Sequence, residues 1–94
     1  MDDVRIDRTR AHELVAAGAR LVDVRTPEEF ATGAHDGAVN IPVQVIGQTI
    51  DQHFAPDATL VLYCRSGMRS DIGARMLRQM GYAKAYNAGG IGDL

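Results

Sequence analysis

The segment most able to carry chemistry runs from Tyr63 to Ser70 and contains Cys64, the only cysteine of the chain. The apolar run 59–63 before it predicts a buried strand, and a helix is predicted from Ser70 to about Met80. Free N–H groups and a partial positive charge at a helix start favour a nearby anion. We therefore expect the Cys64 thiol between a strand end and a helix N-terminus, where its thiolate form is stabilised.

The same loop contains two fixed cations and a glycine. Gly67 allows the backbone to curl so that successive N–H groups converge. Arg65 and Arg69 add positive charge, and arginine suits bidentate contacts with anions. We expect Cys64 to act as the nucleophile. The loop residues expected to bind an anionic substrate are Arg65, Ser66, Gly67, Met68, Arg69 and Ser70.

Three further features of the sequence bear on the environment of Cys64. A buried core thiol is the alternative interpretation of a single cysteine after an apolar strand, and the arginine, serine and glycine context disfavours it. Asp71, in the first turn of the following helix, would partly oppose the thiolate if it pointed inward. Asp23 and Arg25 are two residues apart on a predicted strand, so both point to the same face, where a buried charge network is expected.

Length and composition limit the remaining possibilities. The chain has 94 residues and 46% hydrophobic residues, which favours one globular domain over residues 1–94. A net charge of −2 gives no indication of nucleic acid or of an anionic membrane surface as a partner. A single cysteine excludes an intramolecular disulfide and a cysteine-based zinc site, and the histidines lack metal-ligand spacing. We therefore expect no metal and no other cofactor.

The sequence also gives expectations about location and assembly. No segment approaches the roughly 18 apolar residues of a membrane span, and residues 1–5 do not begin a secretory signal. We expect a soluble, cytoplasmic protein. Nothing in the sequence suggests an obligate oligomer, so a monomer is expected.

Predicted strands and helices alternate along the chain. Thr26 and Glu29 form a capping box around Pro27, which begins a short helix that Gly33 ends. The alternation predicts an α/β fold, a small three-layer sandwich with a mostly parallel central sheet of about five strands flanked by helices. The predicted strands are 4–6, 21–24, 39–41, 59–63 and 83–86, and the longer helices are 8–17, 43–53 and 70–80, with 87–90 as a loop. The residues of the last helix expected to face the core are Ile72, Met76, Leu77 and Met80.

Five segments in this order resemble the signatures of the single-domain rhodaneses, which are thiosulfate sulfurtransferases, and especially the phage shock protein E type. They are residues 21–30, 33–42, 63–70, 80–82 and 87–91. The resemblance implies a double displacement in which the Cys64 thiolate takes the outer sulfur of thiosulfate, releases sulfite and passes the sulfur to cyanide or a thiol. It also implies that Arg65 and Arg69 orient the sulfonate, and that Asp23 and Arg25 are structural supports of the strand end.

Other functions remain open beside this one. A sulfur-relay module that serves a dedicated protein partner would use the same loop chemistry. Cysteine phosphatases and arsenate reductases on the same fold resemble a Cys-x5-Arg pattern. The loop from Cys64 to Arg69 is one residue shorter, and a loop of this length is too tight for a tetrahedral phosphate. An inactive structural domain is disfavoured because Cys64, Arg65 and Arg69 are all present.

Overall fold

Four parallel strands form the central sheet of the computed structural model, which describes residues 3–94. They are β1 (Arg20–Asp23), β2 (Val39–Asn40), β3 (Leu60–Cys64) and β4 (Ala85–Gly90). The strands lie in the order β2-β1-β3-β4, and every neighbouring pair is parallel. All residues of β3 are buried, as expected for an apolar strand inside a parallel sheet.

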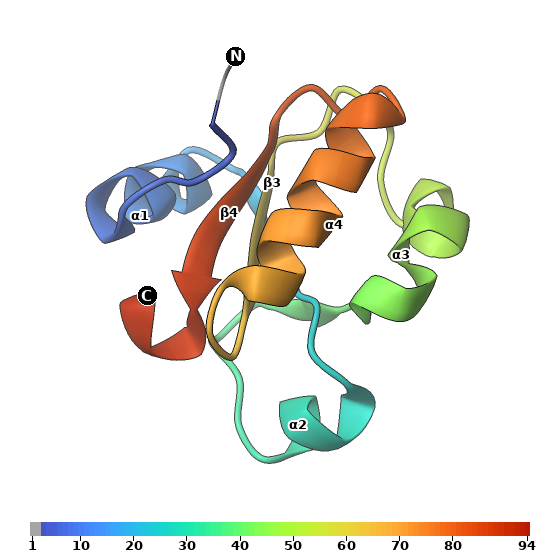
Figure 1. The fold of residues 1–94 in the computed structure, drawn as a ribbon. Helices are drawn as coiled ribbons and strands as arrows, with labels where there is room; N and C mark the ends of the chain where they lie inside the picture. The colour runs from blue at the N-terminus through green and yellow to red at the C-terminus, as the bar shows by residue number, and fades with distance from the viewer. Residues whose placement is uncertain (1–2) are drawn as a thin grey trace.

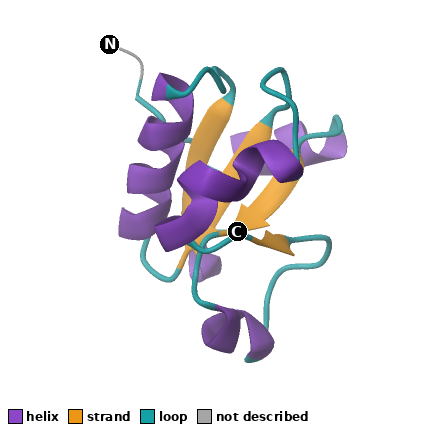
Figure 2. Cartoon of the chain, turned by 90° about the vertical axis from the view of Figure 1, so that its right-hand side faces the viewer, coloured by secondary structure: helices purple, strands orange, loops and turns teal. Residues whose placement is uncertain are grey.

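Helices cover both faces of this sheet, so the structure has three layers (Figures 1 and 2). They are α1 (Arg8–Ala16), α2 (Pro27–Ala31), α3 (Val43–Thr49) and α4 (Met68–Gln79), with 3-10 turns at Ile50–Gln52 and Ile91–Asp93. Helices α3 and α4 pack on one face, where Ile46 and Leu77 join the larger core. Helix α1 packs on the other face through Ala11. The predicted α/β sandwich with a parallel sheet is confirmed.

The short helix α2 lies beyond the carboxyl ends of the strands, at the bottom of both views (Figures 1 and 2). The Thr26 hydroxyl accepts a hydrogen bond from the Glu29 N–H at 3.2 Å, and the Glu29 carboxylate accepts one from the Thr26 N–H at 3.1 Å. These are the two bonds of the predicted capping box. No residue of α2 is buried, so α2 depends on polar contacts with its neighbours more than the strands do.

The sheet has four strands, and the prediction of about five is wrong by one. The expected edge strand at residues 4–6 makes only an isolated bridge between Arg5 and Asn87. The Asn87 N–H donates to the Val4 carbonyl at 2.8 Å, and the Ile6 N–H donates to the Asn87 carbonyl at 2.9 Å. Asp7 then caps α1 through a hydrogen bond from the Arg10 N–H, so the extended segment ends after these two bonds.

The inward face of α4 differs from the predicted one. Of the four residues expected in the core, only Leu77 is buried, because Ile72, Met76 and Met80 are 52%, 36% and 45% exposed. Small residues instead face the sheet: a Cβ added to Gly73 would lie 3.2 Å from the Leu62 side chain. The other buried residues of α4 are Ser70, Gly73 and Ala74. Close packing of the helix backbone on β3 therefore decides which face turns inward.

Two element boundaries near the predicted loop also differ. Helix α4 begins at Met68, two residues before the predicted start, with Gly67 as its N-cap. Strand β4 continues to Gly90, whereas residues 87–90 were expected to form a loop. Its last four residues are buried small or amide residues, which apolar periodicity does not detect. Within residues 3–94, none of the helices combines the length and the hydropathy that a membrane span needs.

The inward face of α4 can be tested with one pair of variants. Leu77→Ala removes a fully buried side chain, so we expect the free energy of unfolding to fall by about 2–5 kcal/mol. Ile72→Ala, on the exposed face, should change it by about 0.5 kcal/mol or less. Urea denaturation of both variants measures the difference. Equal losses for the two variants would contradict the observed orientation of the helix.

Candidate active site

The Cys64 sulfur lies at the carboxyl end of β3, directly beneath the N-terminus of α4. The Gly67 N–H donates a hydrogen bond to Sγ at 3.0 Å, and the Ser70 hydroxyl lies 3.4 Å from Sγ. Cys64 itself is fully buried. The structure thus places a thiol where a strand end, a tight loop and a helix start meet.

Two opposing effects act on the ionisation of this thiol. Burial raises the pKa of Cys64, because a thiolate loses its hydration in the interior. Hydrogen bonds from the Ser70 hydroxyl, and from the backbone N–H groups of Ser70, Gly67 and Ser66, lower it. The hydrogen bonds outweigh the burial, so the pKa of Cys64 lies below that of an ordinary thiol. The loop therefore favours the nucleophilic thiolate form.

Glycines allow β4 to pass directly beside this loop. Gly67 has φ of +99°, and a Cβ added there would lie 3.1 Å from the Gly89 Cα. A Cβ added to Gly90 would lie 2.4 Å from the Arg65 carbonyl oxygen. No side chain fits at either of these contacts, so the loop and the end of β4 fix each other's position.

The two loop arginines have different surroundings. Arg69 makes a bidentate ion pair with the Glu29 carboxylate, at 2.7 and 2.9 Å, which ties α4 to α2. The Arg69 guanidinium is the main reason that the pKa of Glu29 falls to about 2. Arg65 is exposed, and its side chain makes no hydrogen bond or ion pair within residues 3–94. Of the two loop arginines, Arg65 is therefore the one whose positive charge is free for a ligand within residues 3–94.

The two other charged residues singled out by the sequence form a buried pair at the end of β1. Arg25 donates to the Asp23 carboxylate from Nη2 at 2.7 Å and from Nε at 3.0 Å. Arg25 Nη2 also donates to the Gly33 carbonyl at 2.7 Å, which fixes the chain where α2 ends. The side chains of Arg25 and Asp23 are only 6% and 0% exposed. Their geometry is that of a structural support for the strand end beside the loop.

A cleft of about 380 Å³ lies between α2 and the loop. Both signs of charge line it, from the guanidinium groups of Arg25 and Arg65 and from two carboxylates. The full lining is Arg25, Glu28, Glu29, Thr32, Arg65 and Ile91. Because the other lining cation, Arg25, is paired with Asp23, Arg65 is the lining group best placed to attract an anion to this cleft.

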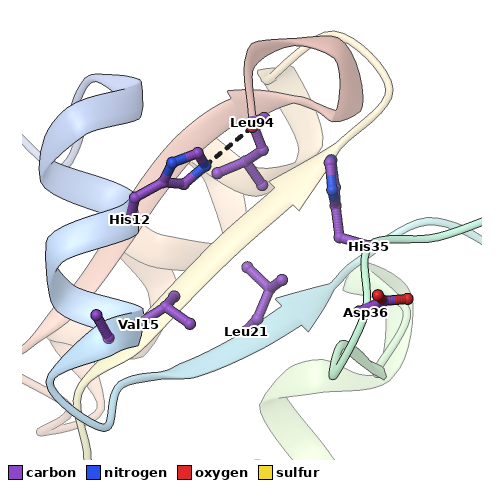
Figure 3. A pocket seen from close by; sticks show the side chains of 7 residues that line it. His12, Val15, Leu21, His35, Asp36 and Leu94 are labelled. Atoms are coloured by element: carbon purple, nitrogen blue, oxygen red, sulfur yellow. Dashed lines mark hydrogen bonds between the residues drawn. The ribbon is translucent and has the colours of Figure 1, made fainter.

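A second pocket lies on the α1 side of the sheet, and none of the loop residues lines it (Figure 3). Val15 and Leu21 make it largely apolar. His12 Nε2 lies 2.9 Å from the Leu94 carbonyl oxygen, and His35 Nε2 lies 2.7 Å from that of Ile91. The two imidazoles therefore hold the C-terminal turn in place, and this pocket is separate from the site at Cys64.

Comparisons with known proteins agree with this geometry. The family model for the rhodanese-like domain matches residues 7–92. The chain belongs to the rhodanese-like family. It is 35% identical over 82 residues to the thiosulfate sulfurtransferase PspE of Escherichia coli (strain K12), covering 85% of this chain and 78% of that protein. It is 38% identical over 73 residues to thiosulfate sulfurtransferase 16, chloroplastic, of Arabidopsis thaliana, covering 66% of this chain and 61% of that protein.

Solved structures give the same assignment. The human single-domain sulfurtransferase TSTD1 superposes with a TM-score of 0.81 at 30% identity, over 95% of this chain and 91% of that one. A rhodanese from E. coli, solved with anions, gives a TM-score of 0.76 at 33% identity, over 82% and 92% of the two chains. The prediction of a rhodanese-type sulfurtransferase is therefore confirmed at the level of family and enzyme class.

The structure of this rhodanese brings three of the seven predicted loop residues together at the sulfur. Cys64, Gly67 and Ser70 meet at the sulfur, whereas Ser66 and Met68 are exposed at the surface of the loop. Met68 is 73% exposed and forms the first residue of α4. Its side chain is thus at the rim of the site rather than in it.

Three residues outside the predicted binding set lie beside the rhodanese loop. The Asp71 carboxylate pairs with Arg75 at 3.0 Å, so it is engaged along the helix surface. Glu29, which the sequence assigns only to a capping box, also holds Arg69. Asn87, which was predicted to lie in a loop, bonds to Ser70 and Gly67. The signal for Asn87 was its place in the segment 87–91 that resembles a family signature, which does not indicate a contact with the loop.

The supporting role of the buried ion pair can be tested against an exposed one. Asp23→Asn leaves the buried Arg25 guanidinium without its anion, so we expect the free energy of unfolding to fall by about 3–5 kcal/mol. Asp71→Asn breaks a pair on the surface and should cost about 1 kcal/mol or less. Guanidinium chloride denaturation measures both. If Asp23→Asn lowers the free energy of unfolding no more than Asp71→Asn does, the buried pair does not support the site.

Proposed function

We propose that this rhodanese transfers a sulfur atom from thiosulfate to cyanide or a thiol through a persulfide on Cys64. The observation that carries the proposal is the Cys64 sulfur at the helix start, with a lowered pKa and with hydrogen-bond donors at Gly67 and Ser70. A thiolate of this kind needs no separate general base. Relatives named thiosulfate sulfurtransferase, and the human thiosulfate:glutathione sulfurtransferase, support this donor and a thiol acceptor.

The reaction consists of two displacements at sulfur. The Cys64 thiolate attacks the outer sulfur of thiosulfate, the sulfur–sulfur bond of the donor breaks, and sulfite leaves with the electron pair. The acceptor, cyanide or a thiolate, then attacks the terminal sulfur of the Cys64 persulfide. Thiocyanate or an acceptor persulfide forms, and the Cys64 thiolate is restored. The Gly67 N–H and the Ser70 hydroxyl, which lie beside the sulfur, would also stabilise the persulfide anion.

Access of the donor is the step that the resting structure restricts. Cys64 is fully buried, so the loop residues 65–67 must move before thiosulfate reaches the sulfur. We assign the sulfonate to Arg65, which is exposed, lines the neighbouring cleft and has no ion-pair partner within residues 3–94. Arg69 could bind the sulfonate only after leaving Glu29, so it acts first as a tie between α4 and α2.

The geometry leaves one alternative function, the sulfur-relay module, open and disfavours the other, the cysteine phosphatase. A sulfur-relay module with a protein acceptor would use the same persulfide, and the nature of the acceptor is what separates it from a stand-alone enzyme. No contact favours a cysteine phosphatase, because Arg69, the arginine that would hold a phosphate, is already bound to Glu29.

The persulfide can be detected by intact-protein mass spectrometry. We expect the native protein to gain about 32 Da, one sulfur atom, on incubation with thiosulfate and to lose it on addition of cyanide. Cys64→Ser should show no gain, while its circular dichroism spectrum and unfolding transition stay close to those of the native protein. A folded, reduced native protein that gains no mass would reject thiosulfate as the donor.

The role of Arg65 can be tested by steady-state kinetics. We expect Arg65→Ala to raise the KM for thiosulfate about tenfold or more, because a charge-assisted contact contributes about 1.5–3 kcal/mol. The KM for the acceptor should change little. Arg10→Ala, which removes an exposed arginine of α1, is the matched control and should leave both values unchanged. An unchanged KM for thiosulfate in Arg65→Ala would exclude Arg65 as the anion ligand.

A further inference from the structure

We infer that Asn87 is a positioning residue that holds two of the hydrogen-bond donors of the Cys64 sulfur, the Gly67 N–H and the Ser70 hydroxyl, in place without touching the sulfur. The inference rests on the proposed function, in which the Cys64 thiolate is the nucleophile. Asn87 lies in β4 and is only 3% exposed. Asn87 is the first residue of the segment 87–91 that resembles a family signature, and the hydrogen bonds of its side chain indicate what it does.

The Asn87 amide fixes the first donor, the Gly67 N–H, from behind. Asn87 Nδ2 donates to the Gly67 carbonyl at 3.1 Å, while the Gly67 N–H donates to Cys64 Sγ at 3.0 Å. Gly67 is therefore held on both sides, by the sulfur and by the amide. A glycine with φ of +99° has no side chain to keep it in this orientation, so the amide contact adds to the restraint from the Asp71 N–H, which donates to the same carbonyl at 3.0 Å.

The second donor, the Ser70 hydroxyl, is held by the other end of the same amide. Ser70 Oγ lies 2.7 Å from Asn87 Oδ1 and 3.4 Å from Cys64 Sγ. The Gly67 and Gly89 carbonyl oxygens, at 3.2 and 3.4 Å, are further acceptors for this hydroxyl. A hydroxyl has one proton, so it donates to one acceptor at a time, and Asn87 Oδ1 is the nearest of them. A thiolate or persulfide anion attracts the proton, and a neutral thiol releases it to Asn87. The hydroxyl can therefore follow the charge of the sulfur by a rotation alone.

This rotation leaves no buried polar group without a partner. Asn87 Oδ1 also accepts a hydrogen bond from the Gly89 N–H at 2.8 Å, which remains when Ser70 turns to the sulfur. An unpaired buried polar group costs about 1–3 kcal/mol, so this second bond removes a penalty that would oppose the anion.

Only an amide of this size meets these requirements. A carboxylate has no donor for the Gly67 carbonyl, and an aliphatic side chain would remove that contact and the acceptor of the Gly89 N–H together. The backbone of Asn87 is itself fixed, because its N–H donates to Val4 at 2.8 Å and its carbonyl accepts from Ile6 at 2.9 Å. The N-terminal segment thus anchors the residue that positions the loop.

The test is the pH dependence of Cys64 alkylation by iodoacetamide, followed by intact mass. The midpoint of this profile reports the pKa of Cys64, and its plateau at high pH reports access to the sulfur. We expect Asn87→Ala to raise the midpoint by about one unit, so that the rate well below the midpoint falls about tenfold. Ser70→Ala should also raise it. Adding Asn87→Ala to the Ser70→Ala variant should raise the midpoint further, because the restraint on the Gly67 N–H is then lost while no hydroxyl is left to shift between Asn87 and the sulfur.

A control on the same strand separates this role from a purely structural one. Tyr86→Phe, next to Asn87 and in contact with Arg78 rather than with the loop, should leave the midpoint unchanged. An Asn87→Ala protein with the native midpoint, even if less stable to heat, would overturn the inference. If Asn87→Ala does not fold, Asn87→Asp keeps the acceptors for Ser70 and Gly89 and should raise the midpoint, and an unchanged midpoint overturns the inference.

The two proposals fail in different measurements. The alkylation profile does not depend on any sulfur donor, whereas the proposed function fails when the native protein takes up no sulfur from thiosulfate. A native protein that takes up sulfur, with an Asn87→Ala midpoint equal to its own, would leave the proposed function intact and remove Asn87 from it.

Discussion

The hydrogen bonds to the buried Cys64 sulfur are the interaction on which the site depends. Burial alone would make this thiol less acidic and less reactive, as it does for a cysteine in an apolar core. The Gly67 N–H and the Ser70 hydroxyl reverse that effect because they point at the sulfur from a helix start. The fold supplies both groups by joining the most buried strand of the sheet to α4 through a loop of three residues.

The layers around this loop are held together by different forces. The sheet and the helices on its faces are held by apolar packing, with β3 fully buried at the centre. The carboxyl edge of the sheet, where α2 lies, is held by charge and hydrogen bonds. There the Asp23–Arg25 pair secures the end of β1, and the Glu29–Arg69 pair joins α2 to α4. Chemistry is thus placed where the structure is polar and adjustable, on a base that is apolar and rigid.

The sequence predicts the parts of this arrangement that depend on local patterns. The alternation of strands and helices, the capping box of Thr26 and Glu29, and Cys64 at a strand end follow from neighbouring residues and are found in the structure. The inward face of α4 does not follow, because two faces of that helix carry suitable residues. Ile72, Met76 and Met80 form the more apolar face, yet Gly73 allows the closer approach to β3.

Contacts between distant residues are the other part that the sequence does not reveal. Glu29 and Arg69 are forty residues apart, and Asn87 is seventeen residues from Ser70. Arg69 and Ser70 can be assigned to the site from the loop sequence, whereas Glu29 and Asn87 have ordinary local interpretations as a cap and as a loop residue. The roles of Glu29 and Asn87 depend on which elements become neighbours, and periodicity carries no information on that point. The fold must therefore be known before these two residues can be assigned to the site.

The contact between the loop and β4 has a consequence for how this scaffold could change. The loop cannot gain a residue on its own, since Gly67 and Arg65 already lie against the backbone of Gly89 and Gly90 without room for a methyl group. A wider loop, able to enclose a tetrahedral oxyanion, would require the end of β4 to shift along or away from β3. The neighbouring strand therefore limits how far this loop can widen, so the width of the loop is a property of the sheet as well as of the loop itself.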